Sequence, residues 1–125
     1  MMEDQPEEAI REMARNFEAR WGERRKRIAE RSTRAREEAM RLTKRFRQRD
    51  PELRQVVLFG SLAHGGVSAH ERFDIDLAVE SDHYLALVGE ALDSEFDINV
   101  VDLRNVWKAI LEEIETFGEV LYERR

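Results

Sequence analysis

The chain has 125 residues, a formal net charge of −6 and no cysteine. This length favours one modest domain with an appendage over a two-domain enzyme that carries its own acceptor-binding lobe. Without cysteine there are no disulfides and no thiolate metal sites, which fits a reducing compartment. No apolar run is long enough to span a bilayer and the N-terminus is acidic, so we expect a cytoplasmic protein without membrane contact.

Charge divides the chain into two parts. Residues 1–50 carry 15 Lys and Arg against 11 Asp and Glu, a net +4, whereas residues 51–125 carry 6 against 16, a net −10. Such an asymmetry indicates segments with different roles. We therefore predict an N-terminal helical extension over residues 1–50 and a separate domain over residues 51–125.

The first part has a helical pattern. Apolar residues recur at steps of three and four, as one face of a helix requires; these are Ile10, Met13, Ala14, Phe17 and Trp21. The pattern becomes sparser after Trp21, and Gly22 and Ser32-Thr33 offer places for a break. We expect one long helix or two in series, starting near Asp4 and ending at Asp50-Pro51.

The helical part contains a basic run, Arg24-Arg25-Lys26-Arg27. Such a run can bind a nucleic-acid backbone or an acidic protein surface. Glutamates are interleaved along the segment and allow pairs four residues apart, so we favour a solvated helix face over nucleic-acid binding. Because so long a helix cannot bury its whole surface on so small a domain, self-association through the N-terminal helices or a partner protein is our hypothesis.

The second part alternates strands and helices. Apolar runs predict strands at about Gln55–Phe59, Phe73–Val79 and Phe96–Val101. One amphipathic helix separates the last two strands, another ends at Gly118, and Val120–Tyr122 is suited to an edge strand. This order predicts an α/β (α+β) fold, a small mixed β-sheet with helices packed on one face.

Aspartates alternate with apolar residues in the second and third strands. Side chains in a strand alternate faces, so Asp74 and Asp76 share one face while Ile75 and Leu77 face the core. Asp97 occupies the same face if the third strand is a neighbour of the second. Converging carboxylates repel one another unless water or a divalent cation compensates them, and oxygen ligands are those that Mg²⁺ prefers.

The first strand ends at Gly60-Ser61. Glycine has no Cβ and lets the backbone approach a ligand closely. If a short helix begins at Ser61, its free N–H groups and the Ser61 hydroxyl would point at an anion. The residues alone thus predict a phosphate-accepting turn beside a pair of carboxylates.

Taken together, these motifs resemble a known family. The segments Gly60-Ser61-Leu62-Ala63-His64-Gly65, Asp74-Ile75-Asp76 and Phe96-Asp97-Ile98 are similar to the signature of the DNA polymerase beta-type nucleotidyltransferases. More closely they resemble the minimal nucleotidyltransferases, the MNT domains. The resemblance covers about Val56 to Tyr122, and it departs from the family at His64, where a basic residue is usual, and at Phe73, where serine is usual.

The resemblance implies Mg²⁺-dependent nucleotidyl transfer. It assigns two Mg²⁺ ions to the catalytic carboxylates of Asp74, Asp76 and Asp97. It assigns the phosphates of ATP or another nucleoside triphosphate to Gly60, Ser61 and His64. The residues give no indication of which base is bound.

The resemblance also implies a partner. MNT-domain proteins commonly act as antitoxins beside a HEPN-domain toxin, and some transfer AMP to a hydroxyl of that protein. The long basic helix would then serve for docking, which is our own hypothesis. One alternative is a catalytically silent binding module that neutralises or assembles with a partner through its helices. Another is an enzyme acting on RNA ends or small molecules, which normally requires further domains.

Overall fold

The N-terminal part forms one continuous helix, α1 (Pro6–Arg49). The structure is a computed structural model and describes residues 6–64 and 74–125. Proline in the first turn, with Glu7 and Glu8, suits a helix start, and Arg47 and Arg49 suit its end. Of the two predicted alternatives, the single helix is therefore the one observed, without a break at Gly22; a start near Asp4 lies outside the described residues.

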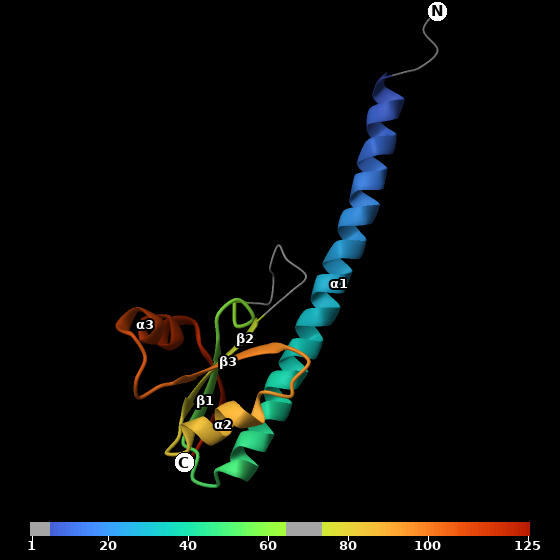
Figure 1. The fold of residues 1–125 in the computed structure, drawn as a ribbon. Coiled ribbons are helices and arrows are strands. Elements are labelled where there is room, and N and C mark those ends of the chain that lie inside the picture. The colour runs from blue at the N-terminus through green and yellow to red at the C-terminus, as the bar shows by residue number, and fades with distance from the viewer. Residues whose placement is uncertain (1–5, 65–73) are drawn as a thin grey trace, which may run out of the picture.

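The C-terminal part contains a four-stranded sheet and two helices (Figure 1). In chain order the elements are β1 (Gln55–Phe59), β2 (Asp74–Glu80), α2 (Tyr84–Glu90), β3 (Asp97–Asp102), α3 (Lys108–Phe117) and β4 (Glu119–Glu123). The strand order is β3-β2-β1-β4. Strand β2 is parallel to β3, and the other two pairings are antiparallel. The predicted mixed sheet and the edge strand at Val120–Tyr122 are confirmed; the predicted start of the second strand at Phe73 lies outside the described residues.

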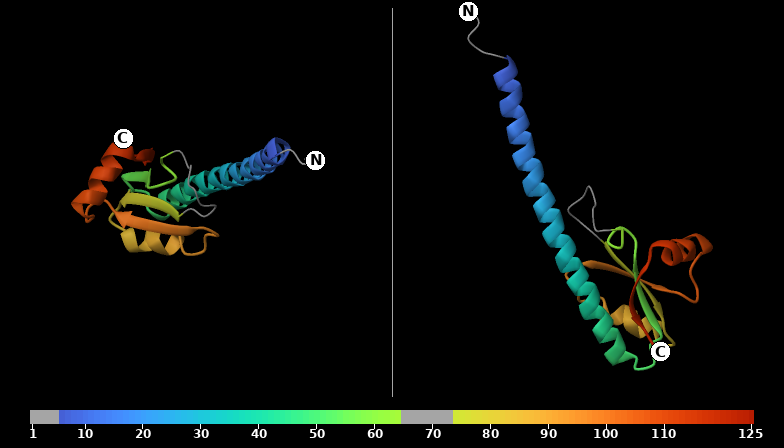
Figure 2. Two further views of the ribbon diagram at one scale, coloured as in Figure 1. Left: turned by 90° about the horizontal axis from the view of Figure 1, so that it is seen from above. Right: turned by 180° about the vertical axis from the view of Figure 1, so that it is seen from behind.

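Helices cover both faces of this sheet. Val56, Leu58, Ile75 and Leu77 face the layer formed by α1 and α2. Val57 and Ala78 point the other way and pack against Ile114 of α3. Figure 2 shows α2 and α3 on opposite sides of the sheet. This arrangement differs from the expected helices on one face, because Val57 and Phe59 make the second side of β1 apolar as well and this side also needs a cover.

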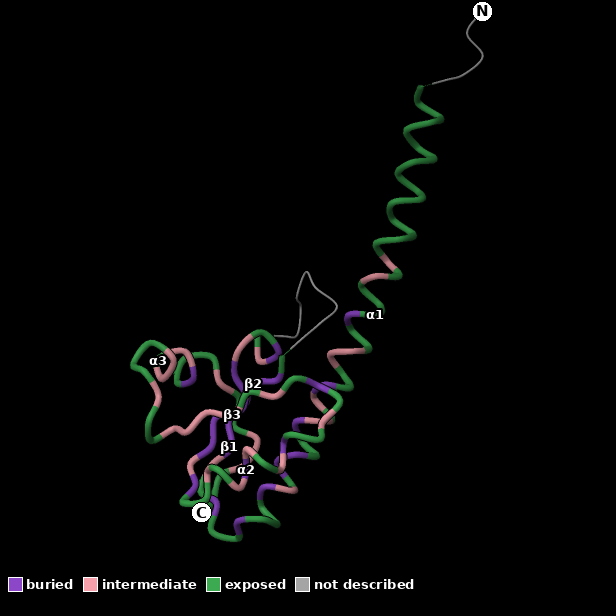
Figure 3. The backbone as a smooth tube through the Cα atoms, viewed as in Figure 1, coloured by how far each residue is buried: buried purple, intermediate pink, exposed green. Residues whose placement is uncertain are grey.

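Only the C-terminal half of α1 takes part in the core. Its buried residues recur at steps of three, four and seven, namely Ile28, Ala35, Ala39, Leu42, Thr43 and Phe46. The preceding residues project beyond the sheet and are almost entirely exposed, as Figure 3 shows. Within residues 6–64 and 74–125, no helix combines the length and apolar character that crossing a membrane requires.

Asp50 joins the end of α1 to the sheet. Its carboxylate is buried and accepts a hydrogen bond from Ser81 Oγ at 2.6 Å and one from the Glu52 N–H at 3.0 Å. The same Ser81 oxygen accepts the N–H of His83 at 2.9 Å, so the network reaches the start of α2.

Replacing Asp50 with Ala should destabilise the protein. The change leaves the Ser81 hydroxyl and the Glu52 N–H without this acceptor, which costs about 1–3 kcal/mol in the free energy of unfolding. Urea unfolding would measure the loss. Glu52→Ala is the control, because that side chain is exposed and its removal should change the free energy by less than about 0.5 kcal/mol. Equal effects of the two substitutions would contradict a structural role for Asp50.

Candidate active site

The acidic face of β2 lies on the same side of the sheet as α3. Ile75 and Leu77 are completely buried against the α1 and α2 layer. Strand alternation therefore directs Asp74 and Asp76 to the opposite side. Asp74 is exposed and Asp76 is half-buried. The alternation that the sequence predicted for these two carboxylates is observed.

Strand β3 adds a second polar row beside the first. The parallel register pairs Asp74 with Asp97 and Asp76 with Asn99. Asn99 Nδ2 donates a hydrogen bond of 2.9 Å to Asp76 Oδ1. The expectation that Asp97 lies on a strand next to that of Asp74 and Asp76 is confirmed, and Asn99 orients the central carboxylate.

Gly60 lies directly against Asp76. Its φ of 78° is the only positive φ in the described residues and belongs to the region that glycine adopts without strain. A Cβ on this residue would overlap Asp76 Oδ2. The turn after β1 and the carboxylate of β2 are thus in close contact, and a side chain at residue 60 would require the carboxylate or the turn to shift.

The environment of Asp76 raises its pKa. Burial makes the largest contribution because it disfavours the charged form. The hydrogen bond from Asn99 opposes this effect, and the negative charges of Asp74 and Glu113 add to it. A carboxylate held among other carboxylates in this way is poised to accept a cation.

Arg36 of α1 connects the turn that follows Gly60 to β4. The N–H of His64 donates a hydrogen bond of 3.3 Å to the Gly60 carbonyl. Arg36 of α1 donates from Nη2 to the Leu62 carbonyl at 3.1 Å and from Nη1 to Glu119 Oε2 at 2.7 Å. Ser61 is exposed on this turn. The predicted anion-binding helix starting at Ser61 would extend into residues 65–73, which lie outside the described residues.

His64 points toward α3. Its Nε2 lies 3.6 Å from Glu113 Oε1, and its ring packs on Phe117 with the centroids 4.5 Å apart. Glu113 was not among the site residues predicted from the sequence. A single glutamate on an amphipathic helix carries no signal of its own, and only the packing of α3 on this face brings its charge close to Asp76.

The carboxylates of Asp74 and Asp76 provide only some of the ligands that a hard divalent cation requires. Asp74 and Asp76 supply two carboxylates on one face, which is the usual protein contribution to a Mg²⁺ site that also uses substrate phosphates. Among residues 6–64 and 74–125 there is no group of three or more acidic or histidine side chains arranged to hold a metal. Asp97 is adjacent in register but does not complete such a group.

The raised pKa of Asp76 predicts a pH-dependent stability. The folded protein holds this proton more tightly than the unfolded chain, for which the ordinary value is 3.8. The contribution of Asp76 to stability is therefore greatest below that value and is lost as the pH rises through the folded pKa. Urea unfolding between pH 3 and 8 in a metal chelator should show that Asp76→Asn removes this component. If the free energy of unfolding changed with pH in the same way in the wild type and in Asp76→Asn, the raised pKa of Asp76 would be contradicted.

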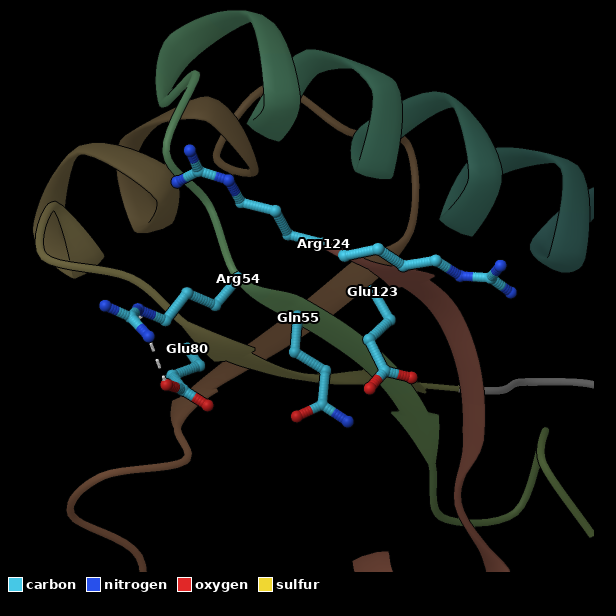
Figure 4. Close-up of a pocket in the computed structure, with 6 residues that line it drawn as sticks. Arg54, Gln55, Glu80, Glu123 and Arg124 are labelled. Atoms are coloured by element: carbon cyan, nitrogen blue, oxygen red, sulfur yellow. Dashed lines mark ion pairs between the residues drawn. The ribbon is translucent and has the colours of Figure 1, made fainter.

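A separate hollow lies at the far end of the sheet (Figure 4). It has a volume of about 440 Å³ and is lined by Arg54, Gln55, Glu80, Glu123, Arg124 and Arg125. Arg54 and Glu80 form an ion pair of 3.9 Å there. The hollow is formed where β1 begins and β2 ends, so it lies away from the turn at Gly60 and shares no residue with the acidic face.

A family model described as polymerase beta, nucleotidyltransferase, matches residues 41–125. No curated protein matches the chain. Similar solved structures include a variant of the toxin-antitoxin MntA-HpeT, which is 27% identical with a TM-score of 0.55 and covers 68% of this chain and 72% of that one.

Two further solved structures share the fold. A toxin-antitoxin with AMP-PNP is 24% identical over 69% of this chain and 74% of that chain, with a TM-score of 0.56. A tri-AMPylated HEPN toxin from Shewanella oneidensis in complex with MNT antitoxin is 24% identical over 72% and 73%, with a TM-score of 0.54. The matched region includes β1, β2, β3 and the turn at Gly60. The chain therefore belongs to the polymerase beta nucleotidyltransferase family.

Proposed function

We propose that the chain transfers a nucleoside monophosphate, with AMP as the expected group, from a nucleoside triphosphate to a hydroxyl of a HEPN-domain partner. The observation that carries the proposal is the contact between Gly60 and Asp76, which joins a turn suited to phosphate with a row of carboxylates. Family membership supports the class of reaction. The partner and the AMP group are suggested by the complexes named above.

The proposed reaction is a substitution at the α-phosphorus. The acceptor oxygen forms a bond to this phosphorus, the bond to the bridging oxygen of the β-phosphate breaks, and pyrophosphate leaves. We assign Gly60, Ser61 and His64 to the terminal phosphates and Asp97 to the proton of the acceptor hydroxyl. Asn99 holds the carboxylate of Asp76 in one orientation through its hydrogen bond.

Asp74 and Asp76, with Asp97 beside them on β3, would hold the Mg²⁺ of this reaction, and the metal would supply neutralisation of phosphate charge and a lower pKa of the acceptor hydroxyl. The chain itself contributes the pair of carboxylates on β2 and the close approach of the turn. Glu113 adds negative charge beside Asp76 and therefore favours a cation over a bare triphosphate at this position.

The proposal can be tested by labelling. The protein is incubated with Mg²⁺, ATP labelled at the α-phosphate and a HEPN-domain protein as the candidate partner. We expect label on that partner, on a hydroxyl-bearing side chain located by mass spectrometry. Label on an RNA end would instead support the alternative enzyme class.

The absence of label on either acceptor, combined with tight binding of the partner, would favour the catalytically silent binding module. In that case Asp74→Asn and Asp76→Asn would leave the neutralisation of the partner unchanged. The two functions are therefore distinguished by comparing labelling with protection from the partner's toxicity in the same variants.

A further inference from the structure

The N-terminal half of α1, residues 6–27, projects beyond the domain and carries an exposed apolar stripe. It consists of Ile10, Met13, Phe17 and Trp21, whose exposed fractions are 64%, 68%, 63% and 42%. Phe17 and Trp21 stack on each other with ring centroids 6.4 Å apart. A surface hollow of about 290 Å³ is lined by these two residues together with Arg20 and Arg24. Large apolar side chains gathered on one side of an exposed helix indicate a protein-binding surface.

The stripe continues the face by which α1 packs on its own domain. Trp21 is seven residues before Ile28, and Ile28 is seven before Ala35, so all three lie on one side of the helix. The protein uses this side for helix packing in the C-terminal half of α1. In the N-terminal half the same side meets no part of the domain among the described residues (Figures 1 and 3).

Along residues 6–27 of α1 the charge changes from acidic to basic. The first two turns contain Glu7, Glu8 and Glu12 with one arginine, whereas the last turns contain the basic run at residues 24–27. Glu7 and Arg25 are 18 residues apart, which is five helical turns, and both therefore lie along the same flank of the stripe.

The stripe and the charges have midpoints half a residue apart. The position midway between Ile10 and Trp21 lies between Arg15 and Asn16, and the position midway between Glu7 and Arg25 is Asn16. If a second copy runs antiparallel about a twofold axis at this point, Ile10 faces Trp21 and Glu7 faces Arg25. A surface that complements itself about a twofold axis is the defining property of a symmetric dimer interface.

We propose that two copies of the chain associate through antiparallel pairing of residues 7–27 of α1. A parallel pair would place the two basic runs side by side and is disfavoured by repulsion. In the antiparallel pair each domain lies beyond the N-terminus of the other copy's helix, so the two acidic faces stay apart. This association is independent of nucleotidyl transfer.

Sedimentation velocity of the full chain tests the pairing. We expect a concentration-dependent species of twice the 14.8 kDa chain mass. Phe17→Glu should raise the dimer dissociation constant by about a hundred-fold or more, because it buries a charge in the stripe. Ala19→Glu is the matched control, since it adds the same charge on the opposite side of the same helix turn and should leave the constant unchanged within about three-fold.

Charge reversal tests whether the two α1 helices pair in the antiparallel orientation. Glu7→Arg alone or Arg25→Glu alone should weaken the dimer by about three- to ten-fold, and the two substitutions in one chain should restore it. A monomer at all concentrations, equal effects of Phe17→Glu and Ala19→Glu, or a failure of the double reversal to restore pairing would overturn the proposal. The proposal would also be overturned if Phe17→Glu abolished binding of the HEPN-domain partner but left the dimer intact.

Discussion

Asp76→Asn should abolish nucleotidyl transfer while leaving the protein folded. The substitution keeps an oxygen that can accept the hydrogen bond from Asn99, but it removes the charge that a divalent cation needs. Loss of several kcal/mol of electrostatic stabilisation corresponds to a reduction in rate of ~10³-fold or more. Initial rates of partner labelling with saturating ATP and Mg²⁺ would measure this loss.

The same variant should gain stability in the absence of metal. Burial and the charges of Asp74 and Glu113 disfavour the ionised form of Asp76, and the neutral amide avoids this penalty. Unfolding in a chelator at pH 7 should therefore show Asp76→Asn to be at least as stable as the wild type. Mg²⁺ should then stabilise the wild type and have little effect on the variant.

Asp93→Asn is the matched control for this experiment. Asp93 is exposed, and its ion pair with Arg45 is long at 3.7 Å. The same chemical change at this position should leave transfer and Mg²⁺-dependent stability unchanged. Transfer that persists in Asp76→Asn, or that falls equally in Asp93→Asn, would contradict the assigned role of the β2 carboxylate.

Gly60→Ala should impair both stability and transfer. The positive φ alone costs about 1–2 kcal/mol for a residue with a Cβ. In addition, the new methyl group would overlap Asp76 Oδ2, so the carboxylate or the turn must move. A displacement of about 1 Å at a reacting centre can reduce the rate by ~10²-fold.

Gly22→Ala is the control for Gly60→Ala. Gly22 lies inside α1, and a Cβ built there meets nothing within 4 Å. Alanine at this position should stabilise the helix by about 0.5–1 kcal/mol and leave transfer unchanged. Thermal unfolding and labelling rates of the two variants would be compared side by side. An active and stable Gly60→Ala protein would show that the close contact with Asp76 is not required.

The sequence alone was sufficient to predict the strands and the row of aspartates that lies on β2 and β3. Alternating polarity in Asp74-Ile75-Asp76-Leu77 reflects a strand with one face in the core, and this pattern is local. The Gly60-Ser61 turn was also recognisable, because a glycine at the end of an apolar run is a local signal. The family resemblance rested on these same segments, and the family match confirms it.

Tertiary structure decided what local patterns cannot express. The parallel pairing of β2 with β3 sets Asn99 beside Asp76, and the packing of α3 on the second face brings Glu113 and His64 together. The contact of Gly60 with Asp76 joins residues 16 apart in the chain. Sequence periodicity reports which side of an element is apolar, whereas the choice of neighbour depends on how all the elements pack at once. The amino-acid sequence therefore determined the composition of the acidic row and its turn, and the packing of the sheet and α3 determined which side chains surround it.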